Sequence, residues 1–115
     1  MINKDCIFCK IGSGQVTGDL LYKDQKAFVI KDIQPKAPVH LLIIPLQHFQ
    51  LFKDLKSSNE DLIGHLFSIA NKMAIEFNLV DGGWRLIVNQ GEDAGQTVPH
   101  LHLHLLGGNL LSPLN

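Results

Sequence analysis

In Pro99-His100-Leu101-His102-Leu103-His104-Leu105-Leu106-Gly107-Gly108, histidine and leucine alternate with a period of two residues. This is the repeat of an extended strand, in which successive side chains point to opposite faces of a sheet. The leucines are therefore expected to face a hydrophobic core, while three of the chain's six histidines share the other face.

Three interpretations of the histidine face compete. A solvated face is disfavoured, because exposed positions usually carry residues such as Lys, Glu or Thr. A metal site is the second, since imidazole is a common zinc ligand and residues i and i+2 of a strand lie side by side. The third is nucleophilic catalysis, in which a neutral imidazole attacks the substrate and its neighbours orient it or handle protons. The strand alone does not separate the last two.

Composition narrows the class of protein. A chain of 115 residues fits a single domain, residues 1–115. Charged residues make up only 18% of the chain, which hints that an oligomer covers part of the surface. A net charge of −1 argues against a nucleic-acid partner, and there is no basic run that would indicate a membrane surface.

The N-terminal stretch Met1-Ile2-Asn3-Lys4-Asp5-Cys6 lacks the apolar run of a secretion signal, so we expect a cytoplasmic protein. In that compartment Cys6 and Cys9 are expected to be reduced thiols or metal ligands. They lie in a short helical turn that ends at Gly12-Ser13-Gly14. Two thiolates are half of a structural zinc site, and two small side chains half-buried near Phe8 are the alternative.

The other elements are predicted from periodicity and turn residues. Strands are expected at 20–22, 27–30, 39–45 and 84–89, and a long amphipathic helix at 57–77, with Ser57 as N-cap and Glu60 completing a capping box. The strand at 39–45 is apolar enough to be buried on both faces, and His40 within it is either a satisfied core residue or a catalyst. Asp32, at a strand end, is a candidate to bind a sugar diol or else a solvated turn residue, and His48 is a candidate ligand or a surface residue.

The loop at 90–97, which leads into the histidine strand, carries Gly91 and Gly95. Glycine permits backbone angles that turn amide groups toward an anion, and Gln96 and Thr97 add side-chain donors. Next to three histidines, this loop is a candidate phosphate site.

The histidine strand and this loop resemble the signature of the histidine triad (HIT) nucleotide hydrolases and transferases, most closely the Hint branch of purine nucleoside phosphoramidases. The similar stretch is Gly95-Gln96-Thr97-Val98-Pro99-His100-Leu101-His102-Leu103-His104-Leu105-Leu106-Gly107-Gly108. Further matches follow in order: Ile7-Phe8-Cys9-Lys10-Ile11, Asp32-Ile33-Gln34-Pro35-Lys36-Ala37-Pro38-Val39-His40, Ile43-Ile44-Pro45 and Ile87-Val88-Asn89. Thr97 and Pro99 stand where the branch often has Ser and an aromatic residue, and the C-terminal tail lacks an aromatic residue that some relatives carry.

The resemblance implies an α+β, HIT-like domain with a five-stranded antiparallel sheet, one long helix and one short helix, paired into a ten-stranded sheet in a homodimer. It implies that His102 is the nucleophile, supported by His40 and His100. The residues implied around the nucleotide are His104, Asn89, Gly95, Gln96 and Thr97 at the phosphate and leaving group, Asp32 at the ribose, and Ile7, Phe8, Ile11, Ile33 and Leu42 at the purine. Cys6, Cys9, His48 and His100 resemble the zinc ligands of some bacterial relatives, and His100 cannot easily serve both sets.

The activity implied is hydrolysis of the P–N bond of purine nucleoside 5′-phosphoramidates through a nucleotidyl–histidine intermediate. An unperturbed imidazole has a pKa near 6.5, so a histidine nucleophile needs no separate strong base at pH 7. No cofactor is required in this scheme, and zinc would be structural. The ligands expected are AMP, GMP or their phosphoramidate conjugates. The alternatives are a dinucleoside polyphosphate hydrolase, a nucleotide-binding regulatory module with incidental activity, and a zinc-dependent hydrolase.

Overall fold

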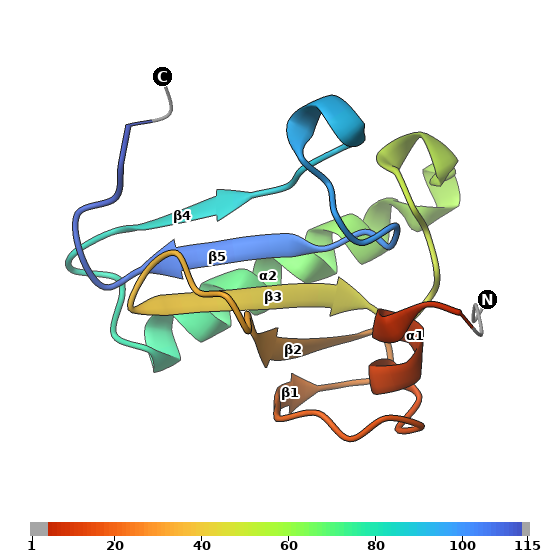
Figure 1. Cartoon of the computed structure of the whole chain (residues 1–115), viewed down its shortest axis with the longest axis horizontal. Coiled ribbons are helices and arrows are strands. Elements are labelled where there is room, and N and C mark those ends of the chain that lie inside the picture. The colour runs from red at the N-terminus through yellow and green to blue at the C-terminus, as the bar shows by residue number, and fades with distance from the viewer. Residues whose placement is uncertain (1–4, 114–115) are drawn as a thin grey trace.

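Five antiparallel strands form one sheet in the order β1-β2-β3-β5-β4, and the long helix α2 lies across one of its faces (Figure 1). The computed structural model describes residues 5–113. Residues 1–4 and 114–115, which include most of the N-terminal stretch interpreted above and both ends of the predicted domain, lie outside the described residues. The main elements are α1 (Ile7–Gly12), β1 (Leu20–Lys23), β2 (Ala27–Lys31), β3 (Val39–Pro45), α2 (Glu60–Glu76), β4 (Trp84–Ile87) and β5 (Leu103–Gly107).

The predicted α+β fold with one long and one short helix is therefore confirmed for the single chain. Within the described part, none of the helices has both the length and the apolar character that a membrane span requires.

β3 is the central strand, paired with β2 on one side and β5 on the other. Its residues from His40 to Pro45 are all buried, which confirms the prediction of a strand covered on both faces. Alternate side chains enter two separate apolar clusters: Leu41 and Ile43 face α2, whereas Leu42 and Ile44 lie with α1. Odd-numbered and even-numbered residues of β3 therefore point to opposite faces of the sheet.

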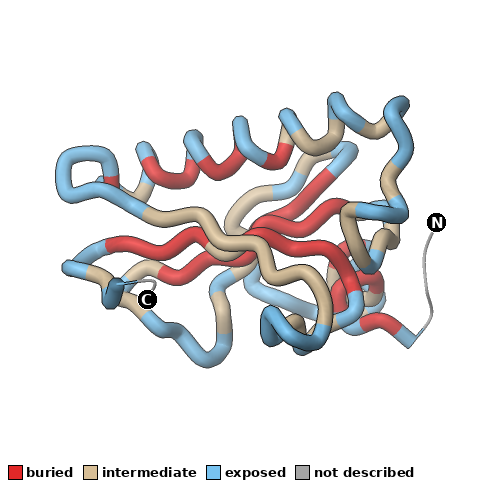
Figure 2. Tube along the Cα trace, turned by 90° about the horizontal axis from the view of Figure 1, so that it is seen from above, coloured by how far each residue is buried: buried red, intermediate tan, exposed pale blue. Residues whose placement is uncertain are grey.

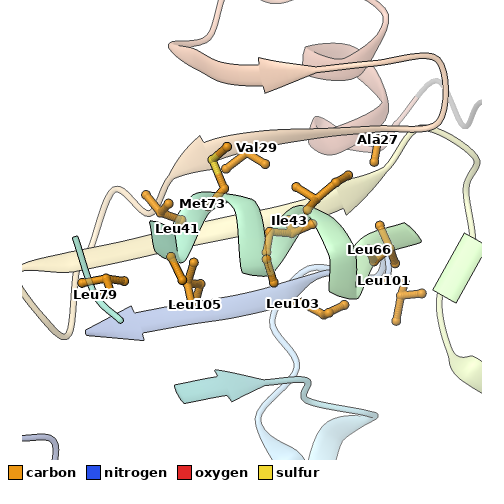
Figure 3. Close-up of a cluster of buried hydrophobic side chains, with 13 residues drawn as sticks. Ala27, Val29, Leu41, Ile43, Leu66, Met73, Leu79, Leu101, Leu103 and Leu105 are labelled. Atoms are coloured by element: carbon orange, nitrogen blue, oxygen red, sulfur yellow. The ribbon is translucent and has the colours of Figure 1, made fainter. Parts of the chain in front are cut away.

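The face toward α2 holds the larger core (Figure 3). The leucines of the histidine stretch, Leu101, Leu103 and Leu105, are at most 1% exposed there, as predicted. α2 contributes a buried stripe that Figure 2 shows turned toward the sheet, made of Leu66, Ile69, Ala70, Met73 and Ala74. Each fully buried Leu, Ile or Met side chain contributes about 1.5–3 kcal/mol, and more of these side chains are buried on this face than on the other.

The ladder of β5 begins at Leu103, later than the alternation indicated. Pro99 has no N–H to give to a sheet, and the next two amides are used elsewhere: His100 N–H donates to the Val98 carbonyl and Leu101 N–H to the Phe49 carbonyl. The chain from His100 to His102 is therefore extended but held by loop contacts, and its side chains keep the predicted alternation.

The predicted start of the long helix is wrong. Ser57 does not cap α2; residues 57–59 form a turn of 3-10 helix, and α2 begins at Glu60. The Oδ1 atom of Asn59 accepts a hydrogen bond from the Lys56 N–H at 2.9 Å, and this closes the turn before the helix can start at Ser57. Short amide side chains commonly compete with helical hydrogen bonds in this way.

Candidate active site and metal-ligand cluster

His40 and His104 meet on the face of the sheet opposite α2. In the β3–β5 ladder Leu42 is opposite His104 and Leu106 is opposite His40, so the two imidazoles are diagonal neighbours. His40 Nε2 lies 2.9 Å from His104 Nδ1. The Lys36 N–H donates to His40 Nδ1 at 3.0 Å, so the proton of neutral His40 is on Nε2 and is donated to His104 Nδ1. The proton of neutral His104 is consequently on its Nε2.

Asp32 completes this group. One carboxylate oxygen accepts the Gln34 N–H at 2.8 Å, and the other lies 3.3 Å from His40 Nε2 and 3.9 Å from His104 Nδ1. Burial lowers the pKa of His40 in spite of Asp32, and burial together with the neighbouring imidazoles lowers the pKa of His104 to about 4. Both rings are therefore neutral at pH 7.

The same three side chains lie close enough together for a metal ion, but the hydrogen bonds argue against one. A metal would need a lone pair on His40 Nε2, and the ring could offer it only with a proton on Nδ1, directed at the Lys36 N–H. Asp32, His40 and His104 are thus better described as a hydrogen-bonded network.

His102 is 5% exposed and held between aromatic rings. The centroid of the Phe8 ring lies 5.2 Å away with the planes at 74°, and that of His104 lies 5.0 Å away. His102 Nδ1 is 2.7 Å from the main-chain oxygen of His100. A carbonyl only accepts, so Nδ1 carries the proton and Nε2 keeps its lone pair. The main chain therefore fixes the tautomer that a histidine nucleophile needs.

The side chain of His100 is directed away from this group. Its Nε2–H donates to the Pro45 carbonyl at 2.8 Å, which leaves the lone pair on Nδ1. That atom lies 3.3 Å from Cys6 Sγ, 3.6 Å from Cys9 Sγ and 3.1 Å from His48 Nδ1. Burial lowers the pKa of His100 to about 4. The resemblance implied that His100 is either a metal ligand or a support for the nucleophile. Its side chain fits the role of metal ligand, whereas its main-chain carbonyl supports His102.

These four side chains, called the four-ligand cluster below, fit a tetrahedral zinc ion. Two thiolates and two imidazoles are a common donor set for structural zinc, with Zn–S and Zn–N distances of about 2.3 and 2.0–2.1 Å that put neighbouring ligand atoms about 3.3–3.8 Å apart. The separations around His100 Nδ1, and the 3.4 Å between Cys9 Sγ and His48 Nδ1, lie in or next to this range. Both sulfurs are buried thiols, supplied by Cys6 at the N-cap of α1 and by Cys9 within the helix.

The loop before the histidines has the backbone that its glycines predict. Gly91 and Gly95 have φ angles of +89° and +84°. Gln96, however, is used to shape the loop: its Oε1 accepts the Gly91 N–H, and its Nε2 donates to the carbonyls of Gln50 and Val98. Thr97 is exposed and Asn89 half-buried.

The residues implied around a purine divide into two groups. Phe8, Ile11 and Leu42 belong to the apolar cluster on the α1 side of the sheet. Ile7 and Ile33 are 44% and 93% exposed and lie outside that cluster. An isoleucine as exposed as Ile33 has no partner in the apolar core and is available to cover a ligand.

Two groups that shape the site were missed from the sequence, the N–H of Lys36 and the carbonyl of Pro45. Both are main-chain atoms, and residue type does not reveal where they point. The only sequence signal was indirect, since Pro35 and Pro38 restrict the loop that carries Lys36.

Comparison with known proteins agrees with this geometry. A family model described as the HIT domain matches residues 13–110. The purine nucleoside phosphoramidase of Escherichia coli K12 is 36% identical over 111 residues, covering 96% of this chain and 93% of that protein. A histidine triad protein structure from Clostridium difficile superposes with a TM-score of 0.95 at 36% identity over the whole of both chains. A HIT family hydrolase from Clostridium thermocellum gives a TM-score of 0.92 at 43% identity over 96% of each chain. The chain therefore belongs to the histidine triad family, in its Hint-like branch, and is a HIT family hydrolase.

Proposed function

We propose that this protein hydrolyses the P–N bond of purine nucleoside 5′-phosphoramidates and releases the nucleoside monophosphate and an amine. The observation that carries the proposal is the 2.7 Å hydrogen bond from His102 Nδ1 to the His100 carbonyl, which leaves Nε2 as a nucleophile next to His104. The related Escherichia coli purine nucleoside phosphoramidase supports the substrate class.

In the first step His102 Nε2 forms a bond to phosphorus as the P–N bond breaks. The departing amine needs a proton, which would pass through His104 Nε2–H or the Thr97 hydroxyl. In the second step water attacks phosphorus, its oxygen stays on the nucleotide, and its proton restores the donor while His102 leaves. Division into two steps through a covalent intermediate avoids one difficult displacement.

Negative charge on the non-bridging oxygens requires donors that are already in place. Because the Gln96 side-chain amide and the main-chain amides of Gly95 and Gln96 all donate within the loop, we assign this role to His104. Asp32 would accept hydrogen bonds from the ribose hydroxyls, and Phe8, Ile11 and Leu42 would line the purine pocket with Ile7 and Ile33. No metal is needed at the reacting atoms in this scheme.

The test is a pair of measurements on wild type and His102→Ala. Wild type should hydrolyse an adenosine 5′-phosphoramidate faster than diadenosine tetraphosphate, and the variant should lose about 10³-fold or more in kcat because no other group can form the covalent bond. Rapid-quench mass spectrometry of wild type should find a nucleotide adduct on His102. A variant that turns over at near wild-type rates would refute the role of His102, and a preference for the dinucleotide would select the alternative hydrolase.

We also propose that the four-ligand cluster holds a structural zinc ion. When bound, zinc would cross-link three parts of the chain: the start of α1 through Cys6 and Cys9, the loop after β3 through His48, and the segment before β5 through His100. Such a cross-link contributes folding free energy without entering the reaction.

A homodimer paired through β4 completes the proposal. β4 is an edge strand of the sheet, so within residues 5–113 no strand lies beside its outer N–H and C=O groups. Trp84, at its start, is 36% exposed. Pairing of two β4 edges would give the ten-stranded sheet that the family resemblance implies, and it would remove an edge that is otherwise prone to aggregate.

A further inference from the structure

His100 joins the four-ligand cluster to the candidate nucleophile. Its Nδ1 faces the two sulfurs and His48 at 3.1–3.6 Å, while its main-chain oxygen accepts the proton of His102 Nδ1 at 2.7 Å. An imidazole clamped at both nitrogens, by the cluster and by the Pro45 carbonyl, cannot rotate without breaking contacts. The position of the carbonyl that sets the His102 tautomer therefore depends on what holds the His100 ring.

α1 makes a second connection between the same two sites. The helix has six residues and no place in the sheet, too short to be stable alone. Cys6 and Cys9, which it presents to the cluster, flank Phe8 in sequence. The Phe8 ring lies edge-on to His102 with centroids 5.2 Å apart and edge-on to His100 at 5.8 Å. Whatever anchors the two cysteines thus also anchors a wall of the proposed nucleotide pocket.

We infer that metal binding at the four-ligand cluster and nucleotide binding at the histidine face are positively coupled, so that each ligand tightens the other. The inference rests on the proposed function, since it takes the occupant of the histidine face to be a nucleotide. Without metal, the His100 ring is held by the Pro45 carbonyl and by hydrogen bonds within the cluster, in which a thiol is only a weak donor. α1 is then held by the packing of Phe8 and Cys9 in the apolar cluster with Phe28. Zinc fixes both, and the nucleotide then binds a pocket that is already ordered.

Linkage makes the coupling reciprocal: the factor by which zinc improves nucleotide affinity equals the factor by which nucleotide improves zinc affinity. Couplings between sites are typically about 5–150-fold. We expect at least about fivefold here, because both connections, the His100 carbonyl and Phe8, act in the same direction.

The first measurement uses AMP as the nucleotide probe. AMP is titrated calorimetrically into zinc-loaded wild type and into wild type stripped with a chelator, with zinc per chain counted by atomic emission. The zinc-loaded form should bind AMP at least about fivefold more tightly. Equal dissociation constants would overturn the coupling while leaving the proposed function intact, whereas no AMP binding by either form would instead contradict the proposed function.

The second measurement needs only the folded, metal-bound protein. Competition with a chromophoric chelator gives the zinc dissociation constant with and without saturating AMP, and AMP should lower it by the same factor. An unchanged constant refutes the coupling even if the stripped protein proves unstable. Hydrogen exchange adds a structural readout: the Lys10 and Ser13 amides, which bond to the carbonyls of Cys6 and Cys9, should exchange more slowly when zinc is bound.

His48→Asn is the variant of choice, because His48 lies in the loop after β3, outside the helix that carries Phe8, and its contacts are with Cys9 and His100 and not with His102. It should lose stoichiometric zinc and bind AMP as weakly as stripped wild type, whether or not zinc is added. His65→Asn is the matched control: His65 lies on α2, pairs with Asp24 at 2.6 Å and touches neither site, so its zinc content and AMP affinity should equal those of wild type. A His48→Asn protein that lacks zinc yet binds AMP with full affinity would contradict the inference.

Discussion

At the scale of single residues, the chemistry depends on which nitrogen of each imidazole carries the proton. Three acceptors and donors decide this, and all belong to the main chain: the His100 carbonyl for His102, the Lys36 N–H for His40 and the Pro45 carbonyl for His100. Because main-chain atoms fix the tautomer of each histidine, most substitutions of nearby side chains should leave the tautomers unchanged.

We therefore expect opposite tautomers for the two central histidines at pH 7. In ¹⁵N-resolved spectra of the side chains, His102 should be protonated on Nδ1 and His40 on Nε2. His102→Gln and His40→Gln provide assignments, each removing one set of signals. Protonation of His102 on Nε2 would leave that atom without a lone pair for attack and would count against the proposed nucleophile.

What sequence could predict at this scale was residue type and face. The alternation placed His102 and His104 opposite the leucines, because side-chain direction in an extended chain depends only on parity. The alternation did not show that the His100 side chain points away from those of His102 and His104. The residues that His100 contacts instead are distant in sequence: Cys6, Cys9 and His48. The family resemblance supplied that zinc set, and the structure shows its geometry.

At the scale of elements, α2 contains a glycine that it does not require. Gly64 has an ordinary helical φ, and a Cβ at this position would meet nothing within 4 Å. Gly64→Ala should stabilise the protein by about 0.5–1 kcal/mol, because glycine costs backbone entropy inside a helix. Urea unfolding followed by circular dichroism measures the change.

Gly95→Ala is the matched substitution with the opposite expected sign. A Cβ there also meets nothing within 4 Å, but φ is +84°, so alanine would be strained by about 1–2 kcal/mol. If both substitutions shift stability in the same direction, backbone conformation is not what distinguishes them.

The elements themselves were largely predictable, and their ends were not. The apolar run of β3 predicted its bounds, and the helical periodicity predicted the buried stripe of α2. The start of α2 was missed because Ser57 and Asn59 are both residue types favoured at an N-cap, and the sequence does not reveal that the Asn59 side chain closes the preceding turn instead. The order of the sheet was equally hidden, since β5 pairs with a strand more than fifty residues earlier.

At the scale of the whole molecule, buried neutral histidines make stability depend on pH. The pKa of His104 is lowered to about 4 in the folded protein, chiefly by burial, against about 6.5 in an unfolded chain. Between these values the unfolded state binds more protons, so the free energy of unfolding falls as pH drops from about 6.5 to about 4.

His104→Asn should make that decline shallower, because an amide oxygen can accept the His40 Nε2–H without titrating. Urea unfolding of both proteins at pH 7, 6, 5 and 4, in the same zinc state, measures it. Asp24 does not confound the comparison. Burial raises its pKa, but hydrogen bonds, foremost from the Lys26 amide, outweigh burial and hold the pKa at about 2. The contribution of Asp24 to the free energy of unfolding is therefore lost only below about pH 4. Parallel curves for the two proteins would show that His104 is not the titrating group.

The two-sided burial of β3 has a consequence for how this molecule can change. Leu41 and Ile43 contact the core under α2, whereas Leu42 and Ile44 contact the cluster on the α1 side, where we propose that the nucleotide binds. If that proposal holds, substitutions at neighbouring positions of one strand would have separate effects, so the pocket could change on one side while the core under α2 stays the same.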